Sequence, residues 1–236
     1  MGPSELYVSA VHRLRQSAER RGVLERLEAS SRPSLRHLRT LFAIYDAEDL
    51  SYLDLPWWSY AAIRRIEEFL RGRPEAKVFE FGAGASTTWL ARRAGTVISV
   101  EHDTEFATTV SRLVAGHGNV TLLKVPADPV TGEAPRTPSQ RRGHEGLDFT
   151  RYVATIDDLD RHFDLIVIDG RARLRCLDQA KKHLAPGGLI VFDDVQRSRY
   201  RAALRYPNLD ATVYRGFGPC LPLPTSTAVL EQRQLS

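Results

Sequence analysis

Acidic residues directly follow two apolar runs in the second half of the chain. Asp169 comes after FDLIVI at residues 163–168, and Asp193 and Asp194 follow LIVF at residues 189–192. Both runs predict buried strands of a parallel sheet, whose carboxyl ends meet at one edge. Three carboxylates gathered there would repel one another unless a cation neutralises them. A hard divalent cation, for which Mg²⁺ is the usual choice, makes all three aspartates candidate metal ligands.

Such a metal would hold two substrate oxygens, lower the pKa of a hydroxyl and direct the resulting oxyanion at its target. The alternative is a site without metal, in which Asp169 or the nearby His144 acts as the general base. An acid after a strand can also do no more than cap the helix that follows it. The residues alone leave these interpretations open.

A glycine turn lies earlier in the chain, between an apolar run at residues 77–81 and a helical stretch at residues 88–94. Gly82 and Gly84 allow the backbone to turn sharply and to approach a ligand closely. Glu101 ends the next predicted strand about 20 residues further on, where a carboxylate can accept hydrogen bonds from a ribose diol. The pattern predicts a βαβ unit that binds a nucleoside-containing cofactor.

Two residues in this turn separate the candidate cofactors. Thr87 stands where a dinucleotide fingerprint has its third glycine. Glu80 precedes the first glycine and would repel a pyrophosphate, but it would complement an α-ammonium or a sulfonium, directly or through water. The residues therefore favour a positively charged nucleoside. The alternative is a glycine turn in another kind of α/β domain.

An acid followed by G-x-G resembles the first motif of the class I S-adenosylmethionine (SAM) methyltransferases, and A-P-G-G-L-I-V at residues 185–191 resembles their motif before strand five. The likeness extends from about Pro56 to the C-terminus. It implies SAM as the cofactor. It also implies a Rossmann-like α/β sheet of seven strands in the order 3-2-1-4-5-7-6, with the last strand antiparallel.

The same resemblance implies a set of cofactor-binding residues. They are Glu80, Gly82, Gly84 and Ser86 around the methionine part, Glu101 on the ribose, His102 or Asp103 near the adenine, Asp128 at the adenine amino group and Trp57 as a roof. Two of these roles have structural alternatives. Asp128 would otherwise be a surface acid, and Trp57 would be part of a hydrophobic staple into the core.

The three aspartates resemble those of the metal-dependent O-methyltransferases, both the catechol and caffeoyl-CoA type and the sugar-modifying type related to macrocin methyltransferase. The catechol type has Asp-Asn where this chain has Asp193-Asp194, whereas the sugar type has Asp-Asp. The I-D-G-R-A-R run around Asp169 reproduces neither group closely. The resemblance implies methyl transfer to an oxygen of a small molecule with the help of Mg²⁺. The alternatives are an RNA or protein methyltransferase and a non-catalytic SAM-binding protein.

Basic residues gather near the predicted ligand edge. Residues 129–150 leave from that edge without regular structure, which is typical of a substrate lid, with a solvated basic loop as the alternative. This segment holds Arg136, Arg141, Arg142 and His144. The arginines that follow the two acidic strand ends would suit a carboxylate or phosphate on the substrate. They are Arg171, Arg173, Arg197, Arg199 and Arg201.

Residues 1–55 precede the predicted SAM domain of residues 56–236. Apolar residues at helical spacing predict one helix over residues 4–30 and another over residues 34–45, with Ser34 as its cap. We favour a helical cap over the site. A dimerisation arm, which would make the protein a homodimer, is the alternative.

Composition limits the class of protein. A hydrophobic content of 42%, a charged content of 26% and a net charge of +4 are ordinary for a globular protein and too weakly basic to indicate nucleic acid. Cys176 and Cys220 have no C-x-x-C spacing, which predicts a reducing compartment. We see no membrane-spanning run and no signal peptide. We therefore expect a cytoplasmic protein whose partner is a small anionic or hydroxylated molecule.

Overall fold

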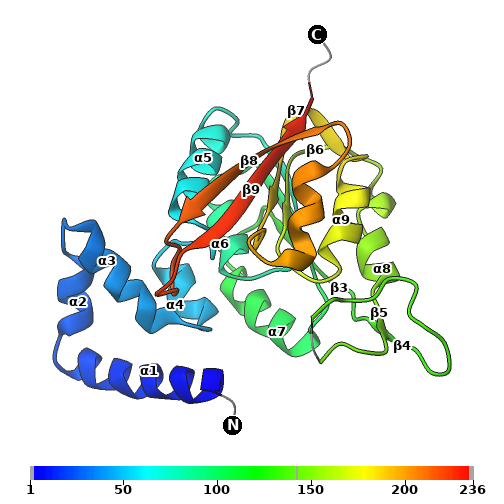
Figure 1. Cartoon of the computed structure of the whole chain (residues 1–236). Helices are drawn as coiled ribbons and strands as arrows, with labels where there is room; N and C mark the ends of the chain where they lie inside the picture. Colours follow the sequence, from blue (N-terminus) through cyan, green and yellow to red (C-terminus); the bar gives the residue numbers. More distant parts are fainter. Residues whose placement is uncertain (1–2, 142, 234–236) are drawn as a thin grey trace.

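The computed structural model describes residues 3–141 and 143–233. Its centre is a seven-stranded sheet with helices on both faces, and the N-terminal helices lie to one side (Figure 1). The strands of this sheet are β1 Lys77–Phe81, β2 Thr96–Glu101, β3 Val120–Lys124, β6 Phe163–Ile168, β7 Leu184–Phe192, β8 Leu209–Gly216 and β9 Thr225–Gln232.

The strand order is β3-β2-β1-β6-β7-β9-β8, and β9 runs antiparallel to both of its neighbours. Counting only the strands of this sheet, the order is 3-2-1-4-5-7-6 with the last strand antiparallel. The predicted sheet is therefore confirmed. The parallel strands β1 and β6 are neighbours at the point where the strand order reverses, and ligands bind at this point in sheets of this kind.

Alternate residues of the central strands pack against different helix layers. Val78 and Val167 face the cluster formed with helices α5 and α6, whereas Phe79 and Ile166 face the cluster formed with α8 and α9. The helices of the sheet domain are α5 Tyr60–Arg71, α6 Ala85–Ala91, α7 Thr104–Leu113, α8 Thr150–Ala154, η2 Asp157–Leu159, α9 Arg173–Ala180 and η3 Ser198–Arg205. A separate two-stranded sheet pairs β4 Asp128–Pro129 with β5 Leu147–Asp148.

The N-terminal segment differs from its prediction. It forms α1 Pro3–Arg20, α2 Val23–Glu28, α3 Pro33–Thr40, η1 Leu41–Ala43 and α4 Ala47–Tyr52. The single helix predicted over residues 4–30 is wrong, because Gly22 adopts a left-handed conformation with a φ of 62° and interrupts it. Ser34 does not cap α3, which begins at Pro33 without a side-chain cap. The short α4, capped by Asp46, was not predicted.

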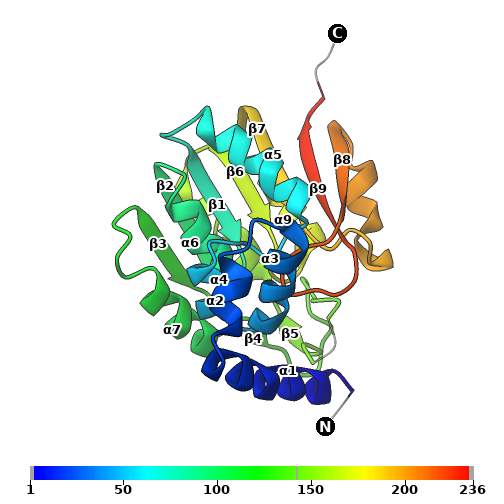
Figure 2. The same ribbon diagram turned by 90° about the vertical axis from the view of Figure 1, so that its left-hand side faces the viewer.

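These helices lie near the carboxyl ends of the parallel strands, with α4 beside α6 (Figure 2). Ser51 in α4 donates a hydrogen bond to Thr88 in α6 at 2.9 Å. Arg39 is buried and forms two hydrogen bonds to Asp49, at 2.7 and 2.9 Å, and a third to Glu28 at 2.6 Å. One buried guanidinium thus holds α2, α3 and α4 together. The domain boundary at residue 55 stays a prediction.

No helix in residues 3–141 and 143–233 combines the length and the apolar character that crossing a bilayer requires.

Replacing Arg39 by alanine should lower the free energy of unfolding by about 3 kcal/mol, because it removes two hydrogen bonds from the buried Asp49 carboxylate and leaves it only the ion pair with Arg15 at 3.2 Å. Urea denaturation followed by circular dichroism measures the change. Arg36→Ala on the same helix is the matched control, since Arg36 is exposed, and it should change stability by no more than about 0.5 kcal/mol. Equal effects of the two substitutions would show that the Arg39 ion pairs do not hold the helices.

Candidate active site at the carboxyl edge of the sheet

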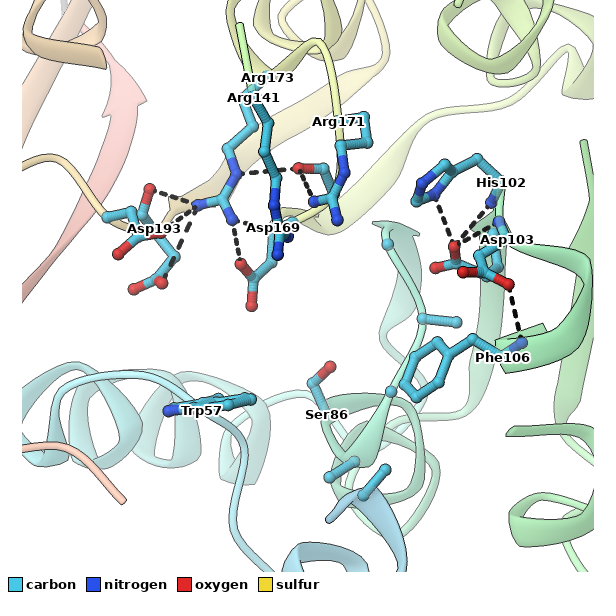
Figure 3. A pocket seen from close by; sticks show the side chains of 18 of the residues that line it. Trp57, Ser86, His102, Asp103, Phe106, Arg141, Asp169, Arg171, Arg173 and Asp193 are labelled. Atoms are coloured by element: carbon cyan, nitrogen blue, oxygen red, sulfur yellow. Dashed lines mark hydrogen bonds and ion pairs between the residues drawn. The ribbon is translucent and has the colours of Figure 1, made fainter. Parts of the chain in front are cut away.

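A cavity of about 630 Å³ opens between the N-terminal helices and the carboxyl ends of the central strands. Its wall includes the glycine turn after β1, the residues after β2, and the aspartates after β6 and β7. Figure 3 shows Trp57 and Ser86 across the cavity from the aspartates and arginines, with His102 and Asp103 at one end. The cavity therefore brings together residues that lie far apart in the sequence.

The glycine turn passes directly against the loop after β6. Gly82 has a φ of 94°, and a Cβ added to it would lie 2.5 Å from the Cα of Gly170. Only glycine fits this conformation and this close approach. Gly82, Gly84 and Ser86 all line the cavity, as the predicted cofactor site requires.

Glu80 is buried behind this turn. Its carboxylate accepts hydrogen bonds from the hydroxyls of Ser86 at 2.5 Å, Thr87 at 2.6 Å and Ser99 at 2.5 Å. Burial raises the pKa of Glu80 to about 7, although the three hydroxyls oppose the shift. Among the described residues Glu80 is not part of the cavity wall. Its position supports the turn from below.

Glu101 and Asp103 lie in the wall at the end of β2. One carboxylate oxygen of Glu101, Oε1, accepts the backbone N–H groups of His102 at 2.9 Å and Asp103 at 2.8 Å. Its other oxygen, Oε2, accepts no hydrogen bond within the described ranges and is available to a diol. Asp103 caps α7 by accepting the N–H of Phe106 at 3.0 Å (Figure 3).

His144 lies outside the cavity wall. Its Nε2 accepts a hydrogen bond from Nε of Arg171 at 2.9 Å, and its ring lies 5.6 Å from that of His102. Burial, followed by the nearby Arg171, lowers the pKa of His144. Because the lone pair of Nε2 is occupied, this arrangement gives no support to a general base, and the catalytic role of His144 stays a prediction.

Asp128 also differs from its prediction. It lies in β4, outside the cavity wall, and forms an exposed ion pair with Arg151 at 2.6 Å. This pair lowers the pKa of Asp128. The structure thus supports the alternative of a surface acid and gives no support to a contact with adenine.

The two neighbouring tryptophans have different surroundings. Trp57 lines the cavity, and its ring packs edge-on against Tyr45 at 5.2 Å. Trp58 is fully buried in the core and packs edge-on against Trp89 at 5.7 Å. The predicted roof therefore matches the placement of Trp57, while Trp58 stabilises the core.

Asp169, Asp193 and Asp194 do meet at one edge, but Arg173 lies among them. Its guanidinium is 2.7 Å from Asp169 Oδ1, 3.6 Å from Asp194 Oδ2 and 4.0 Å from Asp193 Oδ2. Burial alone would lower the pKa of Arg173, but the three carboxylates outweigh burial and raise it. The positive charge that the sequence analysis expected from a metal ion is supplied by the guanidinium of Arg173.

The predicted metal ligands do not fit Mg²⁺ as they are arranged. Asp193 accepts a hydrogen bond from Thr227 at 2.6 Å, and burial followed by Asp169 raises its pKa well above the usual range. A raised pKa disfavours the deprotonated form that a carboxylate needs in order to bind a hard cation. Within residues 3–141 and 143–233, no cluster of three His, Cys, Asp or Glu side chains is arranged to hold a metal.

Asp169 has the properties of a general base. It lines the cavity, and burial raises its pKa to about 6, with Arg173 opposing and Asp194 adding to the shift. A pKa in this range allows a carboxylate to accept a proton near neutral pH. Asp169 is therefore the predicted catalytic residue that the geometry supports.

The segment predicted as a lid reaches the cavity through Arg141. Buried Asp148 anchors this segment by accepting the N–H groups of Arg136 at 2.5 Å, Thr137 at 3.2 Å and Thr150 at 2.7 Å. Arg142 lies outside the described residues. A lid function of residues 129–150 stays a prediction.

Four of the five predicted arginines line the cavity, and Arg201 does not. Arg197 is paired with Asp194 at 3.0 Å. Arg199 packs over the ring of Tyr200 at 5.0 Å and has no carboxylate partner in the part of the chain described. The analysis of the sequence missed the apolar part of the wall, because no spacing rule connects its members. They are Tyr45, Leu50, Phe106, Tyr200 and Leu221.

Part of the chain matches a known protein family. Residues 79–195 match the family described as a methyltransferase domain. This range contains the glycine turn, Glu101 and all three aspartates of the cavity. No curated protein sequence matches the chain.

Solved structures share the fold at low sequence identity. One of them is the O-methyltransferase TomG from Streptomyces achromogenes, which is involved in tomaymycin synthesis and was solved in complex with SAM. It is 18% identical to this chain with a TM-score of 0.56, and the alignment covers 81% of this chain and 90% of TomG. An O-methyltransferase from Bacillus cereus, in complex with the demethylated product SAH, is 19% identical with a TM-score of 0.55 and the same coverages, 81% and 90%.

An rRNA methylase from Streptococcus thermophilus is 16% identical with a TM-score of 0.52, covering 73% of this chain and 96% of that protein. The neighbours thus differ in substrate and agree in fold. The family match over residues 79–195 supports a SAM-dependent methyltransferase, and the solved structures share its class I fold.

Proposed function

We propose that this enzyme transfers the methyl group of SAM to an oxygen of a small, anionic molecule. The observation that carries the proposal is the placement of Asp169, a carboxylate with a pKa raised to about 6 that lines the cavity beside the glycine turn. SAM supplies an activated methyl group on a sulfonium. The part left to the protein is to bind, orient and deprotonate the acceptor.

The glycine turn and the end of β2 are the proposed SAM site. Gly82 and Gly84 allow the backbone to approach the methionine part, and the free Oε2 of Glu101 would accept hydrogen bonds from the ribose hydroxyls. Trp57 lies on the same side of the cavity as Ser86, across from Asp169 and Asp193 (Figure 3). This arrangement leaves the region around Asp169 for the acceptor.

Asp169 would take the proton of the acceptor hydroxyl. Arg173 fixes Oδ1 of this carboxylate at 2.7 Å, and the indole N–H of Trp58 also lies beside the carboxylate. A carboxylate held in this way presents a defined lone pair to the substrate. The base thus has both the orientation and the pKa that proton removal requires.

The unpaired arginines support an anionic acceptor. Arg141, Arg171 and Arg199 line the cavity, and none has a carboxylate partner in the described part of the chain. Burial is the main cause of the lowered pKa of Arg171, and Arg141 and Arg173 add to the shift. These three arginines place positive charge on this part of the wall. A carboxylate or phosphate on the acceptor would neutralise it through charge-assisted hydrogen bonds.

A second candidate is methylation of RNA. It is favoured by a groove beside the cavity that contains three exposed arginines without carboxylate partners in the described ranges, namely Arg201, Arg205 and Arg215. A polyanion could follow this groove to the cavity.

The third candidate, a non-catalytic SAM-binding protein, predicts cofactor binding without turnover on any acceptor.

Replacing Glu101 by alanine should weaken SAH binding by about 10- to 100-fold, because it removes charge-assisted hydrogen bonds to the ribose. Isothermal titration calorimetry measures the dissociation constant, and circular dichroism checks the fold. Asp128→Ala is the control and should bind SAH as the wild type does, since Asp128 lies outside the cavity. Unchanged affinity in Glu101→Ala would remove the ribose assignment.

Asp169→Asn should reduce methyl transfer by about 100-fold or more while SAH affinity changes little, because the amide cannot accept the proton. Transfer of radiolabelled methyl from SAM to a panel of hydroxylated carboxylic acids and phosphate esters measures activity. In the wild type the rate should fall as the pH is lowered through about 6, the pKa of Asp169, because the base becomes protonated. Undiminished turnover in Asp169→Asn would exclude this carboxylate as the base.

Arg199→Ala should raise KM for an anionic acceptor about 10-fold, because it removes a charge-assisted contact. Arg201→Ala, two residues away and outside the cavity, should leave KM unchanged. The opposite ranking, together with binding of single-stranded RNA that weakens steeply with salt, would favour RNA as the substrate.

A further inference from the structure

We propose that the guanidinium of Arg173 is a resident internal cation that occupies the place of a divalent metal at this site and makes the enzyme independent of metal ions. The part of this proposal that concerns catalysis rests on the proposed function. The part that concerns ion binding stands on the geometry alone and can be tested without an acceptor.

Arg173 is surrounded by oxygen atoms on the cavity edge. Nε donates to the carbonyl oxygen of Gly170 at 3.1 Å, and Nη1 donates to that of Asp193 at 2.8 Å. Nη2 donates to the carbonyl oxygen of Asp169 at 2.8 Å and to its Oδ1 at 2.7 Å. These carbonyl and carboxylate oxygens are the type of ligand that a hard cation prefers. A planar guanidinium satisfies them with donors in a fixed geometry.

The guanidinium is built into the structure and is not a mobile surface charge. The Arg173 side chain is only 7% exposed, and its guanidinium lies over the ring of Tyr200 at 5.2 Å. Arg173 is the first residue of α9 and follows Asp169 by four residues. The short loop between β6 and α9 therefore places the guanidinium of Arg173 at the end of β6 in the folded protein.

The charges at this edge are already balanced. Arg173 and Arg197 face the carboxylates of Asp169 and Asp194, at 2.7 and 3.0 Å respectively. Asp193 accepts a hydrogen bond from the hydroxyl of Thr227, and the guanidinium of Arg173 lies 4.0 Å from its Oδ2. A dication added here would have to expel the guanidinium and break four hydrogen bonds. Removal of the guanidinium, by contrast, would leave the oxygens and the space for a dication.

Arg173 acts on catalysis as a positioning residue. It holds Oδ1 of Asp169 and the backbone at both strand ends, which leaves Oδ2 as the carboxylate oxygen that Arg173 does not bind. A metal would hold the acceptor oxygen directly, whereas Arg173 donates its hydrogen bonds to the protein. The two arrangements differ in what they predict for chelators and for added metal.

The test is titration of the full-length protein with Mn²⁺, which substitutes for Mg²⁺, followed by electron paramagnetic resonance. The wild type should bind no Mn²⁺ at the aspartates. Arg173→Ala should gain one Mn²⁺ site, and the double variant Asp169→Asn, Arg173→Ala should lose it. Arg171→Ala is the matched control, because Arg171 contacts none of the three carboxylates, and it should gain no site.

Melting temperatures give an independent readout. Mn²⁺ should raise the melting temperature of Arg173→Ala and leave that of the wild type unchanged. Arg173→Lys keeps a positive charge and should bind no Mn²⁺, which provides a folded variant if the alanine variant does not fold. One equivalent of Mn²⁺ bound by the wild type and removed by Asp169→Asn would overturn the proposal, as would a folded Arg173→Ala protein that binds none.

Turnover separates this proposal from the proposed function. Methyl transfer by the wild type should be unchanged in EDTA, and loss of activity in EDTA that Mg²⁺ restores would contradict a resident cation. Failure to bind SAH would refute the proposed function and leave the Mn²⁺ results valid.

Discussion

Neutralisation of the carboxylates at the end of the sheet is the constraint on which this site depends. The topology brings Asp169, Asp193 and Asp194 to adjacent strand ends, and they would repel one another without a cation. Arg173 supplies that cation and also bonds to the backbone of both strand ends. The side chain that neutralises the carboxylates therefore also holds the backbone at the ends of β6 and β7 in place.

A second buried carboxylate supports the cofactor side of the cavity. Glu80 accepts hydrogen bonds from hydroxyls on β2 and α6, so the turn between β1 and α6 is held from below. The same turn touches the loop after β6 at Gly82 and Gly170. Because that loop begins with Asp169, the proposed SAM site and the proposed base are parts of one rigid assembly. A shift of either would be transmitted to the other across this contact.

Sequence patterns predicted the sheet well, because strand order follows from apolar runs, glycine turns and the resemblance to a known fold. They also predicted which residues reach the edge, since Asp169, Glu101 and the glycines follow strands directly. They did not predict that Arg173 would turn back toward the aspartates, because that depends on the path of the loop after Asp169. Side-chain direction likewise separates Asp128, which points away from the cavity, from the residues that line it.

The most direct measurement is a crystal structure of the protein with SAH, grown in the presence of Mn²⁺ and recorded at the manganese absorption edge. The account predicts SAH between the Gly82–Gly84 turn and Glu101, with Arg173 among the three aspartates and no anomalous peak there. An anomalous peak bounded by Asp169, Asp193 and Asp194, with the guanidinium of Arg173 displaced, would contradict it.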